Sequence, residues 1–180
     1  IFKQVELASA IAPNVQTWGI IHASVDARSN RLANLARTAI ERQGLTYMEA
    51  TIEDATQVSD AAQSLADKGA EGFIVLWDFI VAREFRFIVG VCNDNDLPLF
   101  ATKPYQVPLG AIASYGYKYE DVGKNAGEKA IQILKTGANP GAIPITPAEE
   151  LQLYISISNA KEQGVEIPQQ YVSQADTVFD

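Results

Sequence analysis

Gly72-Phe73-Ile74-Val75-Leu76-Trp77, followed at once by Asp78, is the stretch of sequence that decides the fold. Five large apolar residues follow one another here, whereas a strand with one face in water alternates polar and apolar side chains. The stretch therefore predicts a strand that is covered on both faces, as in the centre of a parallel sheet. Asp78 would then lie at the carboxyl end of this strand, where open α/β sheets bind their ligands.

The sequence around this strand alternates between short apolar strands and helices whose apolar residues recur at helical spacing. After an opening helix at 2–12, strands are predicted at 15–23, 45–52, 72–77 and 97–102, with helices between them, the last at 80–92. The strand at 45–52 is more polar than the others and is expected nearer an edge. This order, with its short connections, predicts the α/β class, with a doubly wound parallel sheet and helices on both faces.

The last seventy residues follow a different pattern. A strand of small residues is expected at 110–116 and a helix at 119–136. The helix is expected to end at the Gly- and Pro-containing segment 137–141. Extended segments are predicted at 143–146 and 151–157, and two short helices near 158–163 and 168–178.

Composition excludes several classes of function. The chain of 180 residues is 47% hydrophobic and has a net charge of −8, which argues against nucleic acid or an anionic membrane as the main partner. No apolar run approaches the ~20 residues of a membrane-spanning helix, so no membrane insertion is expected. The single Cys92 and the single His22 exclude an internal disulfide, a thiol cluster for zinc and a two-histidine metal site, and no cofactor is expected.

The segment from Gly110 to Gly137, with Ser-Tyr-Gly-Tyr-Lys-Tyr-Glu-Asp-Val-Gly at 114–123, resembles the ABC-transporter substrate-binding protein family that includes the tryptophan-binding type. Further matches are Leu153 to Lys161 and Gly164 to Pro168, together with Ala61 to Leu65 and the strand that ends at Asp78. The resemblance implies a type I periplasmic-binding fold, in which two Rossmann-like lobes enclose a cleft for a small solute.

The sequence resembles only the second half of such proteins, and most of a first lobe is absent from it. We expect residues 1–109 to form the Rossmann-like core of the second lobe. Residues 110–140 would be a crossover strand and helix that belong with the first lobe, and residues 141–180 a return segment with C-terminal helices.

The helix at 119–136 has an apolar face that includes Val122, Ile133 and Leu134, and leaving it in water would forgo about 1.5–3 kcal/mol for each large side chain. It can fold back on this chain's own sheet, dock on a second copy as in domain swapping, or pack on a lobe outside this sequence. We favour the last two arrangements, the homodimer or the absent lobe.

Three loops follow strands at their carboxyl ends and supply the candidate ligand-binding residues. Asp78 can accept hydrogen bonds from a ligand ammonium, or it can cap the next helix, and the two alternatives stay open. Trp77 can stack on an apolar solute or belong to the core, and Tyr105, in a loop flanked by proline, is expected to contact a ligand or partner.

The first of these loops offers Ser24, Ser29 and Asn30, which can donate to a carboxylate near a helix N-terminus or serve as caps. The last loop contains Thr102, whose hydroxyl can hydrogen-bond to a ligand, and Lys103, whose ammonium can bind an anion. A lysine in such a loop is more often simply solvated. Tyr115, Tyr117 and Tyr119 share one face of an extended segment and are expected to pack between lobes, whereas His22 is expected to be a packed or hinge-side residue and not a catalyst.

Catalysis has little support. The sequence contains no nucleophile elbow, no phosphate-binding loop of the Gly-rich type and no HExxH motif. We therefore expect a non-enzymatic, extracytoplasmic solute-binding component of an ABC importer, with an ABC permease as partner and an amino acid or similar small molecule as ligand. The alternative is a ligand-sensing or dimerisation module of a signalling protein built on the same fold.

Overall fold

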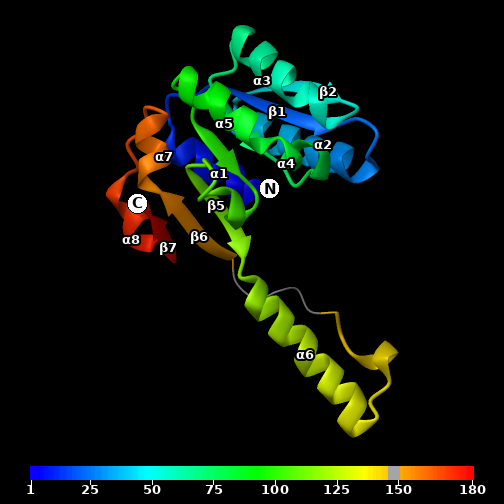
Figure 1. The fold of residues 1–180 in the computed structure, drawn as a ribbon. Coiled ribbons are helices and arrows are strands. Elements are labelled where there is room, and N and C mark those ends of the chain that lie inside the picture. Colours follow the sequence, from blue (N-terminus) through cyan, green and yellow to red (C-terminus); the bar gives the residue numbers. More distant parts are fainter. Residues whose placement is uncertain (146–150) are drawn as a thin grey trace.

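The structure is a computed structural model and describes residues 1–145 and 151–180. Its main sheet has four parallel strands in the order β2-β1-β3-β4 (Figure 1). Their bounds are Thr17–Ala23 for β1, Thr46–Ile52 for β2, Gly72–Val75 for β3 and Leu99–Ala101 for β4. The prediction of a parallel α/β sheet is confirmed, with β3 in the interior and the more polar β2 at an edge.

Both faces of this sheet are covered by helices, which is why β3 lacks a polar face. On one side Ile74 packs in a cluster with residues of α1 (Phe2–Ile11) and α2 (Ala27–Glu41). On the other side Phe73 and Val75 join a second cluster, contributed by α3 (Val58–Asp67), α4 (Phe79–Arg83) and α5 (Phe85–Asp94). Alternate side chains of one strand thus enter two separate hydrophobic cores.

Two boundaries around β3 differ from the prediction. The strand ends at Val75 and not at Trp77, because the side chain of Asp78 caps α4 and the chain turns before it. The single helix expected at 80–92 is two helices that meet at Glu84, whose φ of −116° and ψ of 24° lie outside the helical region. Periodicity did not reveal this break, because Val81 and Phe85 keep helical spacing across it.

A second sheet continues the first. In it β5 (Ala113–Tyr117) pairs antiparallel with β6 (Leu151–Ser156), and β6 pairs parallel with β7 (Thr177–Phe179). Ile112 joins the two sheets: its N–H donates to the carbonyl of Leu99 at 2.7 Å, and its own carbonyl accepts from the N–H of Ser156 at 2.8 Å. The segment before β5 is therefore held against the edge of the parallel sheet.

The end of the chain corrects one further expectation. After α7 (Ile157–Glu162), the helix predicted at 168–178 is only α8 (Gln169–Gln174), and strand β7 follows it. Asp176 fixes this strand: its N–H donates to the carbonyl of Leu153 and its carboxylate accepts from the N–H of Leu153, at 2.9 and 2.8 Å. Pairing with β6 thus overrides the helical pattern.

In the tail before β6, the described residues 143–145 form no strand, and Thr146 lies outside the described residues. Three 3-10 turns complete the described elements, η1 (Ala55–Gln57), η2 (Pro104–Gln106) and η3 (Pro140–Ala142).

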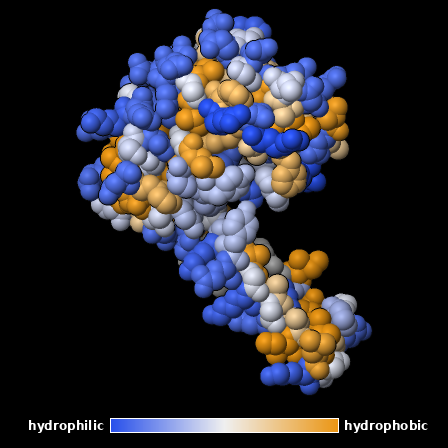
Figure 2. All heavy atoms as spheres, viewed as in Figure 1, coloured by the Kyte–Doolittle hydropathy of each residue, from blue (hydrophilic) through white to orange (hydrophobic). Residues whose placement is uncertain are grey.

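Helix α6 (Tyr119–Thr136) has the bounds that the sequence predicted and leaves the body of the molecule (Figure 1). None of its residues is buried, and Leu134 is 84% exposed. Figure 2 shows hydrophobic side chains gathered on this protruding part. The helix therefore does not fold back on this chain's own sheet. In the described ranges, no helix combines the length and apolarity that a bilayer crossing requires.

Candidate functional site

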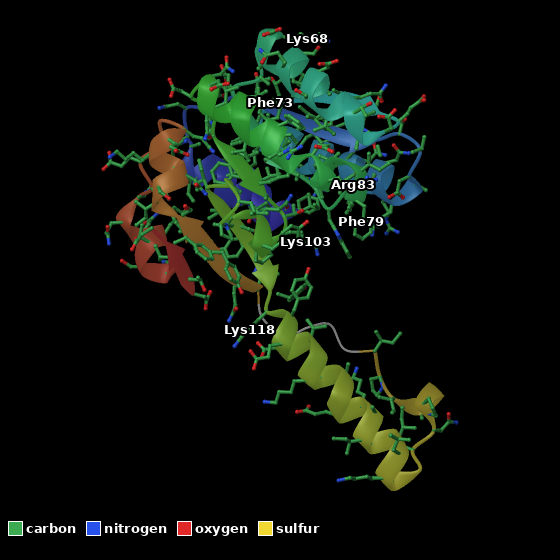
Figure 3. All side chains as sticks on the ribbon, in the orientation of Figure 1. Lys68, Phe73, Phe79, Arg83, Lys103 and Lys118 are labelled. Carbon is green, nitrogen blue, oxygen red and sulfur yellow. The ribbon has the colours of Figure 1, made fainter. Side chains whose placement is uncertain are left out.

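The carboxyl ends of β1, β3 and β4 bring together the loops at 24–30, 76–81 and 102–108. Figure 3 shows Phe79 and Lys103 at the edge of the body from which α6 leaves, whereas Lys68 lies at the opposite edge. The start of α6 is thus beside the same loops. Parallel topology gathers such loops at one edge, which is why the sequence could predict their proximity.

Asp78 organises the central loop. Its carboxylate is 1% exposed and accepts three backbone hydrogen bonds, from Ala23 N–H at 2.7 Å, Ile80 N–H at 2.9 Å and Val81 N–H at 3.1 Å. Two of these bonds cap α4, and the third ties the loop to the end of β1. Of the two roles that the sequence left open, capping is present in the structure, while the ligand contact stays a prediction.

Trp77 follows the strand and is 39% exposed, so it belongs to the site edge and not to the core. Lys103 Nζ lies 3.6 Å from the centroid of its ring, and the Arg28 guanidinium lies 4.7 Å from it. Phe79 packs edge-on against Trp77 at 5.8 Å, and Arg28 is also 4.8 Å from the Phe79 ring. Two cations and two aromatic rings from three loops thus form one cluster.

Lys103 connects this cluster to α6. Its Nζ donates to Tyr119 Oη at 3.2 Å, at the first residue of the helix. The next residue, Pro104, packs so closely on β5 that a Cβ at Gly116 would overlap the proline ring. Glycine is needed at that position for this approach, which holds Lys103 against the end of β5.

A hollow of about 550 Å³ opens beside these residues. Its walls come from the start of α1, from α2, the loops after β3 and β4, the end of β5, the start of α6 and the start of β6. The described lining residues are Ile1, Lys3, Gln4, Leu32, Trp77, Thr102, Lys103, Pro104, Tyr115, Gly116, Tyr117, Tyr119, Val122 and Leu151. The volume is in the range of small-molecule sites.

The remaining predicted site residues take different positions. Thr102 lines the hollow, with its hydroxyl donating to the Val75 carbonyl at 3.2 Å. Tyr105 is not among the lining residues and is half exposed. Its partial burial raises its pKa, and the electrostatic effect of Tyr119 raises the pKa further. Tyr105 therefore lies close to the start of α6.

Most polar side chains of the loop of residues 24–30 bond within the loop, and the Ser24 hydroxyl donates to the carbonyl of Ile52 at 3.2 Å. Asp26 accepts from the Arg28 N–H at 2.9 Å and from the Ser29 hydroxyl at 3.1 Å, and the Asn30 amide donates to the Ser24 carbonyl at 2.8 Å. The bond from the Arg28 N–H makes Asp26, which precedes α2, the cap of that helix. None of Ser24, Ser29 and Asn30 is among the described lining residues of the hollow.

Sequence reasoning missed several members of the site. Arg28 directly precedes the candidate residue Ser29, and Phe79 directly follows the candidate residue Asp78. Their positions in the loops at the strand ends could therefore have indicated both. Gln4 was also missed: its Oε1 accepts from the Tyr115 N–H at 2.8 Å and its Nε2 donates to the Ala113 carbonyl at 3.4 Å. These bonds bring α1 to β5, and no local pattern in the sequence reports a contact over such a separation.

A second polar cluster lies between α2 and β2, away from the hollow. Glu49 accepts from Arg37 Nη2 at 2.8 Å and from Tyr47 Oη at 2.7 Å, and its Oε2 is 3.3 Å from Nε2 of the packed His22. Burial acts to raise the pKa of Glu49, but these hydrogen bonds and charges outweigh it and hold the pKa below its ordinary value.

Comparisons with known proteins identify the family of this chain. A family model described as "ABC transporter substrate binding protein" matches residues 1–179. A tyrosine-binding protein of Clostridioides difficile is 27% identical over 161 residues, which are 89% of this chain and 46% of that protein.

Two solved structures extend the likeness to the fold. The ABC domain of Streptococcus pneumonia in complex with L-Trp has a TM-score of 0.85 at 25% identity, covering 99% of this chain and 60% of that one. A conserved domain protein of Vibrio cholerae has a TM-score of 0.87 at 28% identity, covering 98% of this chain and 59% of that one. The chain thus spans about half to three fifths of the length of these relatives. By the match over nearly its whole length, the chain belongs to the ABC transporter substrate-binding protein family.

Proposed function

We propose that the protein binds an amino acid or a similar small molecule as the solute-binding component of an ABC importer, without catalysing a reaction. One observation carries this proposal: the hollow of about 550 Å³ lies at the carboxyl edge of the parallel sheet, where Trp77, Thr102 and Lys103 meet the start of α6. Such an edge is the usual place for a small-molecule site in open α/β sheets.

The aromatic lining favours a ligand with a flat or apolar side chain. Tyr115, Tyr117 and Tyr119 from β5 and α6 face the same hollow as Trp77. Aromatic rings prefer offset-stacked or edge-to-face partners. Relatives described as binding tyrosine and L-Trp support the same class of ligand.

The predicted site residues receive different roles in this proposal. Trp77 and Thr102 contact the ligand directly, and Tyr105 contacts it when the cleft closes. Because both oxygens of the buried Asp78 already accept backbone hydrogen bonds, we assign Asp78 the positioning of the loop that carries Trp77. Ser24, Ser29 and Asn30 shape the neighbouring loop from which Arg28 extends.

The second wall of the cleft would come from the part of the relatives that this chain does not span. The chain covers 59–60% of the two solved structures, which leaves a length sufficient for another lobe. Of residues 110–140, β5 pairs with β6 in the body of this chain. We propose that α6 belongs with the other lobe, which covers its exposed apolar side chains, Val122, Ile131 and Leu134 among them. Closure of the two lobes on the ligand would then exclude water.

A substitution on α6 tests this assignment. Leu134→Lys should leave the stability of the chain of residues 1–180 unchanged, because Leu134 is exposed there. In a protein that joins this chain to the proposed second lobe, the same change should cost about 1.5–3 kcal/mol, the value of burying one leucine. Thermal unfolding of both forms measures the difference. An equal effect in both would contradict the assignment, and a concentration-dependent effect in the shorter chain would instead indicate docking on a second copy.

Membership of the family also supports an extracytoplasmic location and an ABC permease as partner, and we propose both. The signalling alternative has no observation in its favour in the described part of the chain.

The binding proposal is tested by a thermal-shift screen of the full-length protein against the amino acids and their amides. A ligand at about a hundred times its dissociation constant should stabilise the protein by about 2.7 kcal/mol. A selective shift with aromatic amino acids is the expected result. Absence of a shift with every amino acid, in a protein whose unfolding is cooperative, would contradict the proposal.

A further inference from the structure

We propose that the wall of the cleft carried by this chain binds the carboxylate of the ligand, through the ammonium group of Lys103 with the Arg28 guanidinium beside it. The ligand's own ammonium is then bound by groups outside this chain. This inference rests on the proposed function, because it assigns one end of an amino acid to one wall of the same site.

The charge of the hollow is the first observation. The chain has a net charge of −8, yet the charged side chains among the described lining residues are Lys3 and Lys103, and none of those residues is Asp or Glu. A ligand ammonium placed against this wall would meet like charges, which disfavours it. A carboxylate in the same place would meet opposite charges, which favours it.

The state of Lys103 is the second observation. Its Nζ lies over the Trp77 ring at 3.6 Å and donates to Tyr119 Oη at 3.2 Å. No carboxylate in the described part of the chain forms an ion pair with it. A cation over an exposed ring is held weakly, whereas a charge-assisted hydrogen bond to a carboxylate is strong. A ligand carboxylate can therefore draw Lys103 away from Trp77, which uncovers the ring for the ligand's side chain.

Arg28 is the second cation of the cluster. Its guanidinium lies 4.7 Å from the Trp77 centroid, and its Nη2 is 3.6 Å from Asp26 Oδ2 in a pair that is exposed on both sides. Because exposed pairs of this kind are weak, Asp26 leaves Arg28 able to accept a second anion. The planar guanidinium suits a carboxylate geometrically. Arg28 is not among the described lining residues of the hollow, so it supports Lys103 from the far side of the Trp77 cluster and shares its charge with Asp26.

Asp78 is the acidic side chain that directly adjoins Trp77, and it is unsuited to an ammonium. It is 1% exposed, and three backbone amides already donate to its carboxylate. With this group occupied, the described lining residues offer no counter-charge to a cation. The polarity of the ligand in the cleft follows: carboxylate toward Lys103, ammonium toward the other wall.

Calorimetry on the full-length protein tests this polarity with L-tryptophan and L-tryptophanamide, at a pH low enough that the α-amino group of both is protonated, so that they differ in the charge of the carboxylate alone. In the unmodified protein the amide should bind about 10- to 100-fold more weakly, the factor that one charged hydrogen bond is worth. Lys103→Met should weaken the binding of L-tryptophan by a similar factor and change the affinity for the amide by less than about threefold. Lys68→Met, at the opposite edge of the body, should change neither (Figure 3).

Lys103→Arg separates charge from shape, because it keeps a cation at this position and should retain most of the affinity for L-tryptophan. The proposal is overturned if Lys103→Met weakens the acid and the amide alike, if it weakens neither, or if Lys103→Arg loses as much affinity as Lys103→Met. In these cases the binding of L-tryptophan by the unmodified protein still upholds the proposed function. If the unmodified protein binds no amino acid at all, the proposed function fails and the polarity fails with it.

Discussion

Replacing Asp78 by alanine should be one of the most destabilising single changes at the site edge. The carboxylate caps α4 through two amides, and losing a helix cap costs about 1–2 kcal/mol. It also satisfies the N–H of the buried Ala23, and an unsatisfied buried donor costs about 1–3 kcal/mol. The free energy of unfolding should therefore fall by about 2–5 kcal/mol in Asp78→Ala.

Urea unfolding, followed by circular dichroism, measures this loss. With a slope of about 2 kcal/mol/M, the midpoint should move down by about 1–2.5 M at unchanged slope. Asp26→Ala is the matched control, because Asp26 also caps a helix but accepts a single backbone amide on a partly exposed loop. The control should lose about 1 kcal/mol.

Asp78→Asn refines the test. Asparagine keeps one oxygen, which can still accept from Ile80 and Val81, but it presents no acceptor to Ala23. Its loss should therefore lie between those of Asp26→Ala and Asp78→Ala. If Asp78→Ala costs no more than Asp26→Ala, the carboxylate does not tie the loop to β1, and the reasoning about this site edge is refuted.

Three further predictions concern the site and the cluster beside it. Trp77→Ala should weaken binding of L-tryptophan about 5- to 30-fold, since about 1–2 kcal/mol of ring contact is lost, while Phe87→Ala on α5 should leave it unchanged in calorimetry. Gly116→Ala should lower the free energy of unfolding by about 1–3 kcal/mol and also the affinity for the ligand, because the new Cβ overlaps η2. A Cβ at Gly90 meets no atom within 4 Å, so Gly90→Ala should leave stability, measured by thermal unfolding, and affinity, measured by calorimetry, unchanged. The pKa of Glu49 is depressed in the folded protein, so its stabilisation is present above the unfolded pKa of about 4.3 and is lost as the pH falls through the folded pKa. Glu49→Gln should therefore flatten the loss of the free energy of unfolding between about pH 5 and pH 3. An unchanged dependence of stability on acid pH would contradict this role.

The parallel sheet could be predicted from the sequence because its strands are buried on both faces. The run from Gly72 to Trp77 has no polar residue, and this alone places it in the interior. The bounds of α6 could also be predicted, since acidic residues stand in its first turn and Gly137, with φ of 68°, ends it.

Contacts between distant residues could not be predicted in the same way. Strand β7 follows from the pairing of Asp176 with Leu153, which overrides a short helical pattern. At the site, the strand-end rule brought Trp77, Thr102 and Lys103 to one edge. Their exposure, and the contacts of Lys103 with Trp77 and Tyr119, depend on packing that no spacing encodes.

The central claim is that this chain carries one wall of an amino-acid-binding cleft around Trp77 and Lys103. Titration of the ¹⁵N-labelled full-length protein with L-tryptophan, followed by amide chemical shifts, tests it most directly. The account predicts that the largest shifts within this chain fall in residues 76–81, 102–106 and 115–119. Shifts confined to other parts of the chain would contradict it, for example shifts at a separate hollow that residues of α7 and α8, such as Ile157 and Val172, line.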